Sequence, residues 1–218
     1  NSYNQATVRL GMQVGPGRVG ELVHALTGEK VKAHPSLLLG SADLSVYTMS
    51  QMYQFLASGG RVQPLQSVRA VLDPQGKALS KYEKEPVTAQ KGDAMAARLL
   101  AFGLQQTVTS GSARALLSEG LGDLQSAGKT GTSNDSRDSW YAGYTGDHLA
   151  VIWVGNDKNE PTGLYGATGA MRVWAQLFKR LPSRPLRISG DGLEWVYLDA
   201  SRFATTDDFC PGARRAVF

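Results

Sequence analysis

Ser126-Ala127-Gly128-Lys129-Thr130-Gly131-Thr132 is followed by two strongly apolar segments, residues 139–146 and 149–155, with a short turn where they meet. Two such segments joined by a short turn predict an antiparallel pair of strands. Their nearly continuous apolar character predicts that helices cover both faces of the sheet. We expect residues 127–132 to be a strand of this sheet.

The side chains of this segment are suited to the wall of a binding cleft. Gly131 allows another backbone to approach closely, Lys129 supplies a positive charge, and Thr130 and Thr132 supply hydroxyl and amide groups. A ligand with a carbonyl or carboxylate fits this set, and a free strand edge can pair with an extended peptide. Lys-Thr-Gly is a short motif, however, and a surface lysine before a turn is the alternative interpretation.

A second polar pair stands at the start of the chain, where Ser2 and Asn4 precede an apolar helical pattern. Lys129 follows Ser2 by 127 positions. Serine and asparagine are typical caps, and Asn4 is the expected N-cap of a helix over residues 5–13. Capping alone would explain both residues, but a helix start beside a cleft would also hold the serine hydroxyl and the amide rigidly.

The order of these motifs resembles the active-site set of the penicillin-binding proteins and serine β-lactamases, which is Ser-x-x-Lys, then Ser-x-Asn, then Lys-Thr-Gly. Residues 2–11, SYNQATVRLG, and residues 128–144, GKTGTSNDSRDSWYAGY, resemble the class A, bifunctional penicillin-binding proteins of the Gram-negative 1b branch. The resemblance runs from Ser2 to about Leu181. It implies a mixed α+β (α/β) fold of the penicillin-binding/serine β-lactamase type. In that fold, helices cover both faces of an antiparallel sheet and a helical subdomain leans on it.

The nucleophile motif Ser-x-x-Lys should precede Ser2. The formal match in this chain is Ser126-Ala127-Gly128-Lys129, but a nucleophile of this kind must begin a helix, whereas these residues read as a strand. We therefore expect the chain to be the C-terminal portion of a transpeptidase domain, either a fragment or one piece of a cut molecule. An upstream segment would carry the nucleophile, and the chain alone would be inactive.

The resemblance implies a role for each motif residue. Ser2 would relay a proton, since a hydroxyl donates and accepts at once, and Asn4 would fix a lysine and a substrate amide. Lys129 would favour loss of the Ser2 proton and attract a substrate carboxylate. Thr130, Gly131 and Thr132 would bind the substrate, with the hydroxyls of the two threonines on the carboxylate and the Thr132 amide as an oxyanion donor.

The implied reaction is serine acyl transfer on peptidoglycan stem peptides that end in D-Ala-D-Ala, with β-lactam antibiotics as inhibitors. It requires no cofactor. A metal site is not expected, because His24, His34 and His148 lie far apart in the sequence without ligand spacing. The resemblance also implies a parent with a glycosyltransferase domain and a membrane anchor, at the periplasmic face of the inner membrane in the cell envelope, where envelope accessory proteins are further partners.

Two other functions use the same residues. A carboxypeptidase or β-lactamase would pass the acyl group to water, and product analysis with and without an amine acceptor separates this reaction from transpeptidation. A non-catalytic penicillin-recognition or protein-interaction module would keep the scaffold without the nucleophile. A Ser-x-x-Lys motif upstream in the parent gene would argue against the module.

The amino-acid composition gives further evidence on the class of protein. The chain has 218 residues, 42% of them hydrophobic, and 25 glycines, which is typical of a globular protein. There is no apolar run of about 18 residues that could span a membrane. Asn1 is not followed by a charged and apolar leader, so we expect the natural amino terminus to lie elsewhere. The net charge of +4 comes from scattered lysines and arginines, so we expect no nucleic-acid binding. Cys210 has no second cysteine to pair with in this chain.

Outside the sheet, periodicity predicts a chain rich in helices. The expected helices cover residues 18–26, 46–56, 89–108, 113–117 and 170–181, and a hairpin is expected from strands over 61–72 and 77–82. After Pro182 the composition changes, and a short strand is expected at residues 195–198. We expect residues 1–184 to belong to the transpeptidase domain and residues 185–218 to be an appended tail.

Overall fold

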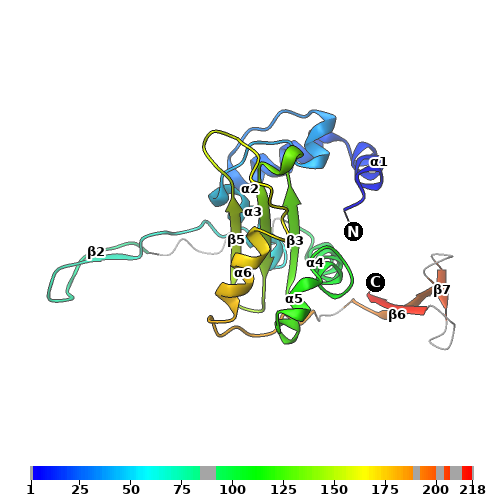
Figure 1. The fold of residues 1–218 in the computed structure, drawn as a ribbon. Coiled ribbons are helices and arrows are strands. Elements are labelled where there is room, and N and C mark those ends of the chain that lie inside the picture. Colours follow the sequence, from blue (N-terminus) through cyan, green and yellow to red (C-terminus); the bar gives the residue numbers. More distant parts are fainter. Residues whose placement is uncertain (1, 84–91, 189–191, 200–203, 207–212, 218) are drawn as a thin grey trace.

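A three-stranded antiparallel sheet lies at the centre of the computed structural model (Figure 1). Its strands are β3 (Ala127–Thr132), β4 (Ser139–Tyr144) and β5 (Leu149–Val154), in the order β3-β4-β5. The turn between β4 and β5 is closed by a hydrogen bond from Thr145 N to His148 O of 2.8 Å. The predicted strand pair and the strand over residues 127–132 are thus confirmed. The structure describes residues 2–83, 92–188, 192–199, 204–206 and 213–217.

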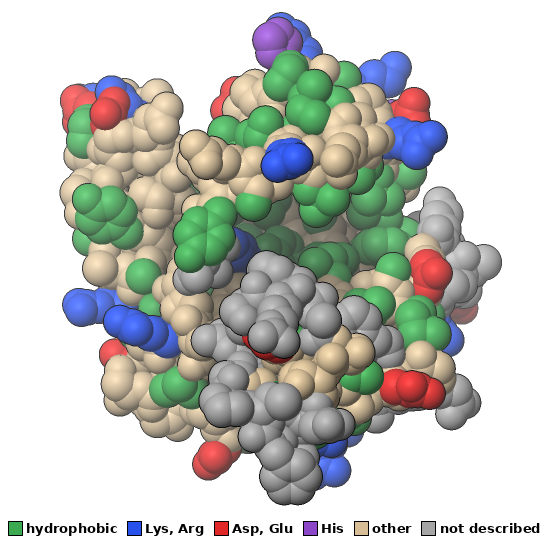
Figure 2. Space-filling model, turned by 90° about the vertical axis from the view of Figure 1, so that its right-hand side faces the viewer, with side chains coloured by type: hydrophobic (Ala, Val, Ile, Leu, Met, Phe, Trp, Pro, Cys, Tyr) green, Lys and Arg blue, Asp and Glu red, His purple; other side chains and the backbone are tan. Residues whose placement is uncertain are grey.

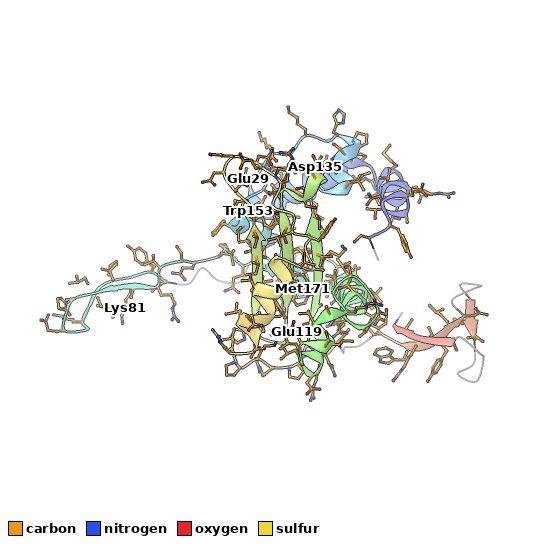
Figure 3. The ribbon with its side chains drawn as sticks, viewed as in Figure 1. Glu29, Lys81, Glu119, Asp135, Trp153 and Met171 are labelled. Atoms are coloured by element: carbon orange, nitrogen blue, oxygen red, sulfur yellow. The ribbon has the colours of Figure 1, made fainter. Side chains whose placement is uncertain are left out.

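One face of the sheet is covered by α6 (Ala170–Phe178). Trp174 of this helix is completely buried, stacks on Phe178 with ring centroids 3.8 Å apart, and meets the edge of Tyr141 of β4 at 5.5 Å. Figure 1 shows α6 in front of the strands, and Figure 3 shows Met171 of α6 over the sheet. The largest core cluster therefore lies between α6 and the sheet.

The other face is covered by α3 (Val46–Ala57) and α4 (Ala94–Thr109). Ala101 of α4, Ala127 of β3 and Tyr144 of β4 form the buried contact on this side. Both helices begin at a side-chain cap, since the oxygen of Ser45 accepts from the amide of Thr48 and that of Asp93 from the amide of Met95. The prediction that helices cover both faces of the sheet is confirmed.

A helical layer formed by the first part of the chain packs beside α3. It consists of α1 (Asn4–Val14), α2 (Pro16–Thr27) and the 3-10 turn η1 (Pro35–Leu39). Gly28 ends α2 at a left-handed φ of 78°. The prediction that Asn4 caps α1 is wrong. The helix begins at Asn4, and Tyr3 is the cap residue, because the Tyr3 carbonyl already accepts the first helical hydrogen bond, from Thr7 N.

A hairpin of β1 (Ala70–Leu72) and β2 (Ala78–Lys81) projects from the body of the molecule (Figure 1). Its turn forms as predicted, with Asp73 Oδ1 accepting from two backbone amides. The predicted strand over residues 61–72 is too long, because it pairs with β2 only at Ala70–Leu72. The amides of Gln63 and Leu65 are taken by the side chains of Gln54 and Gln51 of α3, so this stretch follows the helix instead of a partner strand.

The remaining predictions are confirmed in part. The long helix α4 begins at Ala94, while residues 89–91 of its predicted range lie outside the described residues, as does Cys210. The short elements between α4 and β4 are α5 (Ala115–Ser118) and the 3-10 turns η2 (Gly122–Leu124) and η3 (Asn134–Ser136). The terminal helix on the sheet ends at Phe178, earlier than the predicted residue 181.

Beyond the terminal helix, the structure contains a second three-stranded sheet. The strand expected at residues 195–198 is β6 (Trp195–Asp199), and β7 (Ala204–Thr206) and β8 (Ala213–Val217), which were not predicted, pair with it on either side. Trp195 meets the ring of Phe102 of α4 edge to face, with centroids 5.7 Å apart. The tail therefore carries regular structure that touches α4, and its separation into a unit of its own remains a prediction. None of the described helices combines the length and the apolar character needed to span a bilayer.

Candidate functional site

The structure brings together the Ser-x-Asn motif at the start of the chain and the Lys-Thr-Gly motif of β3. Lys129 Nζ donates a hydrogen bond of 2.6 Å to Ser2 Oγ, although the residues are 127 positions apart. The same ammonium donates to the carbonyl of Thr130 at 2.9 Å. Lys129 is thus held between the edge of β3 and the segment that leads into α1.

The burial of Lys129 changes the pKa of its side chain. Lys129 is half-buried, and removal from water disfavours its charged form, so the pKa of its ammonium is lowered from its ordinary value. The ammonium therefore loses its proton at a lower pH than a lysine in water would. The hydrogen bond to Ser2 places the charge of this ammonium beside the serine oxygen.

The outer edge of β3 carries the groups that could meet a peptide. The Gly128 carbonyl accepts from Thr107 Oγ1 of α4 at 2.6 Å, and the Thr130 carbonyl accepts from Lys129 Nζ. The backbone groups of these alternate residues therefore point away from β4, to the outer side of β3. Because the direction alternates along a strand, the amide of Thr132 points to this side too. β3 is the edge strand of its sheet among the described strands, so its outer side is paired with none of them.

The hydroxyls of Thr130 and Thr132 lie on the opposite face of β3 from Lys129, as strand alternation requires. Thr130 Oγ1 donates to Ser112 Oγ at 2.9 Å, whereas Thr132 Oγ1 accepts from the amide of Gly166 at 2.9 Å. Neither hydroxyl takes part in the contact of Ser2 with Lys129. The two hydroxyls therefore differ in the hydrogen bonds that they can still donate. The proton of Thr130 is used in the bond to Ser112, whereas Thr132 keeps its proton for a further acceptor.

Asn4 is not drawn into this contact. It is exposed in the first turn of α1, and its side chain makes no hydrogen bond to any of the described residues. The structure thus joins Ser2 to Lys129 without joining Asn4 to them.

An aromatic pair lies on the same sheet face as Lys129. Trp140 of β4 stands opposite Gly131, and its ring is 6.3 Å from that of Trp153 of β5. Trp153 Nε1 donates to Asp138 Oδ1 at 2.9 Å. Figure 3 shows Trp153 and Asp135 at the same end of the sheet, the end at which β3 finishes.

The side of the molecule on which α1 and α4 lie is hollowed. Figure 2 shows a deep concavity on this side, with hydrophobic side chains lining it. Concave, mostly apolar surfaces with a few polar groups are typical of binding sites. Within the described ranges, no group of three or more His, Cys, Asp or Glu side chains is placed to hold a metal ion.

Sequence reasoning missed four residues of this region, namely Ser112, Trp140, Trp153 and Gly166. Ser112 lies in a serine-rich stretch that reads as helix caps, and Gly166 lies in a glycine-rich loop without a phosphate-binding motif. No local pattern reveals their contacts with β3. Ser126, whose spacing to Lys129 formally matches the nucleophile motif, precedes a strand and is only 1% exposed.

Comparison with known proteins gives a consistent result. The family model described as "Penicillin binding protein transpeptidase domain" matches residues 20–179. Penicillin-binding protein 1B of Vibrio cholerae is 42% identical over 186 residues, which are 84% of this chain and 24% of that protein. Penicillin-binding protein 1B of Escherichia coli is 38% identical over 189 residues, or 86% of this chain and 22% of that protein. The chain thus spans about a quarter of the length of these relatives.

Solved structures support the fold. Penicillin-binding protein 1A of Haemophilus influenzae superimposes with a TM-score of 0.81 at 20% identity, over 100% of this chain and 38% of that one. The PonA1 protein of Mycobacterium tuberculosis, solved in complex with penicillin V, gives a TM-score of 0.62 at 20% identity over 83% of this chain and 54% of that one. With the family match over most of its length, the chain belongs to the penicillin-binding protein transpeptidase family.

Proposed function

We propose that this chain forms part of a peptidoglycan D,D-transpeptidase, which cross-links stem peptides through a serine acyl-enzyme and is acylated by β-lactams. The observation that carries the proposal is the 2.6 Å hydrogen bond between Lys129 Nζ and Ser2 Oγ, which joins the Ser-x-Asn and Lys-Thr-Gly motifs. The nucleophile and its lysine lie on a segment outside these 218 residues.

The chemistry follows from the groups present. The serine of the upstream segment attacks the carbonyl carbon of the penultimate D-Ala and gives up its proton to the upstream lysine. The carbonyl oxygen becomes negative and is stabilised by backbone amides, among them that of Thr132. Loss of one such donor typically raises the barrier by about 3 kcal/mol.

Collapse of this intermediate breaks the peptide bond and releases the last D-Ala, whose nitrogen takes up a proton through Ser2. The amine of a neighbouring stem peptide then attacks the acyl-enzyme, and its proton returns by the same route to the serine. The role of Lys129 is electrostatic. Its charge stabilises the oxygen of Ser2 while the proton moves, and it attracts the substrate carboxylate toward the edge of β3.

The parent protein would combine this activity with peptidoglycan glycosyltransfer. It would be anchored in the inner membrane, with the transpeptidase domain on the periplasmic face, and could work with envelope accessory proteins. These features are inferred from the relatives named penicillin-binding protein 1B, of which this chain matches about a quarter.

A labelled penicillin tests the proposal. The full-length natural protein that contains these residues is incubated with the label, and the modified peptide is located by mass spectrometry. We expect the adduct on a serine of a Ser-x-x-Lys motif that precedes Ser2, and we expect Lys129→Ala to slow its formation strongly. Absence of any adduct, or an adduct on Ser126, would refute the proposal. Products formed from a stem peptide with and without an amine acceptor separate transpeptidation from hydrolysis.

A further inference from the structure

The loop between β5 and α6 packs against the end of β3 that carries Thr132. The backbone amide of Gly166 in this loop donates a hydrogen bond of 2.9 Å to Thr132 Oγ1. A Cβ atom at position 166 would lie 2.6 Å from the carbonyl oxygen of Gly131 and 2.7 Å from that of Trp140. Both are backbone atoms that cannot move aside cheaply, so this approach requires glycine.

The loop is fixed on both sides of Gly166. Ser139 Oγ of β4 is completely buried, donates to the Tyr165 carbonyl at 2.8 Å and accepts from the Ala170 amide at 2.9 Å. Thr162 donates through its amide and its hydroxyl to the Ser136 carbonyl, at 2.9 and 2.7 Å. The position of the Gly166 amide is therefore set by contacts of its loop with β4 and η3.

This contact decides how the Thr132 hydroxyl is used. A hydroxyl that accepts from an amide retains its own proton, and Thr132 is exposed, so that proton is available to a ligand. A carboxylate can only accept hydrogen bonds, and it therefore needs such a donor. Thr130 differs, because its proton is already directed to Ser112 Oγ.

We propose that Gly166 is a positioning residue for substrate recognition, whose amide orients the Thr132 hydroxyl as a donor to the carboxylate of the acyl donor. The inference rests on the proposed transpeptidase function and adds to it a residue that no motif contains. Gly166 does not touch the substrate; it acts through Thr132.

The test compares two ligands that differ in one group. The full-length parent protein is acylated by a penicillin with its free carboxylate and by the methyl ester of the same penicillin, and the second-order rate constants are measured. We expect Gly166→Ala to lower the rate with the free acid by about tenfold to a hundredfold, the usual effect of losing a hydrogen bond to a charged group. The rate with the ester should change by less than about threefold, since the hydrogen bond at stake is made to a charged carboxylate that the ester lacks.

Matched variants make the result specific. Gly103→Ala, in α4, adds a Cβ where no atom lies within 4 Å and should leave both rates unchanged. Thr132→Val should lose the preference for the free acid, and Thr132→Ser should keep it. In the Thr132→Val background, Gly166→Ala should have no further effect on this preference, because the two residues act in series.

Equal losses with acid and ester in Gly166→Ala would show a merely structural role and overturn the inference. So would a preference for the acid that survives in Thr132→Val, and this outcome decides the matter even if Gly166→Ala does not fold. Failure of the wild-type protein to react with either penicillin would instead count against the proposed function, which keeps the two failures distinct.

Discussion

The ammonium of Lys129 is half-buried, donates to Ser2 Oγ and the Thr130 carbonyl, and has a pKa that burial lowers. Its proposed role needs the charged form. The charge is present below the lowered pKa and is lost as the pH rises through it, so the loss begins at a lower pH than for a lysine in water.

We therefore expect the rate of acylation by penicillin to fall on the alkaline side, below the pH at which an ordinary lysine titrates. Lys129→Arg should keep its charge there, because a guanidinium does not deprotonate in this range. The measurement is the pH profile of the acylation rate for both proteins. If the rate falls at the same alkaline pH in Lys129→Arg as in the wild type, another group causes the fall.

Thr107 of α4 connects a helix to β3 by one buried hydrogen bond, from its Oγ1 to the carbonyl of Gly128 at 2.6 Å. Thr107→Val keeps the shape of the side chain but leaves this carbonyl without its partner. We expect a loss of about 1–3 kcal/mol in the free energy of unfolding, the cost of an unsatisfied buried group.

Chemical denaturation of Thr107→Val and Thr109→Val checks this cost. Thr109 lies on the same helix but is exposed, and among the described residues its hydroxyl bonds to Gln106 of its own turn. Equal stability of the two variants would mean that the bond to β3 contributes nothing measurable.

At the residue scale, the sequence predicted the residues of the two motifs, but it did not predict the residues that form hydrogen bonds with the motif threonines. Ser2 and Lys129 could be paired because their residue types and order resemble a known set. Ser112 and Gly166 could not be predicted, since their contacts with Thr130 and Thr132 depend on the packing of loops that are distant in sequence. Asn4 was predicted as the N-cap of α1, but the helix already begins at Asn4. The extended backbone of a cap residue is found one position earlier, at Tyr3.

Among the elements, α6 covers one face of the central sheet through a strongly one-sided apolar surface. Trp174, in the middle of this apolar surface, is 0% exposed, whereas the adjacent Val173 is 49% exposed. Trp174→Ala should lower the free energy of unfolding by about 3–5 kcal/mol, as expected for the cavity left by a large core side chain.

Val173→Ala on the same helix should cost less than about 1 kcal/mol, as is usual for an exposed position. Thermal or chemical unfolding of both variants measures the difference. A similar cost for the two would contradict the packing of α6 on β4 and β5.

The apolar periodicity of α6 made this helix predictable, and the two apolar segments joined by a short turn did the same for β4 and β5. The first strand of the hairpin was overestimated for a reason that lies in another element, because Gln51 and Gln54 of α3 take the amides that a partner strand would need. The tail sheet was missed in part, since β7 and β8 are short and lack an apolar run.

Taken as a whole, the molecule places its first residues against a strand from the second half of the chain. The helical layer of α1 and α2 and the central sheet thus meet at the contact of Ser2 with Lys129. The proposed catalysis depends on this meeting, because it places the charge of Lys129 beside the oxygen of Ser2.

A double-mutant cycle on Ser2 and Lys129 tests this claim most directly. The acylation rate of the full-length protein by penicillin is measured for the wild type, Ser2→Ala, Lys129→Ala and the double variant. If the two side chains act as one unit, the double variant should lose no more than about the larger of the single losses. Single losses that multiply in the double variant would show that Ser2 and Lys129 act independently and would contradict the account.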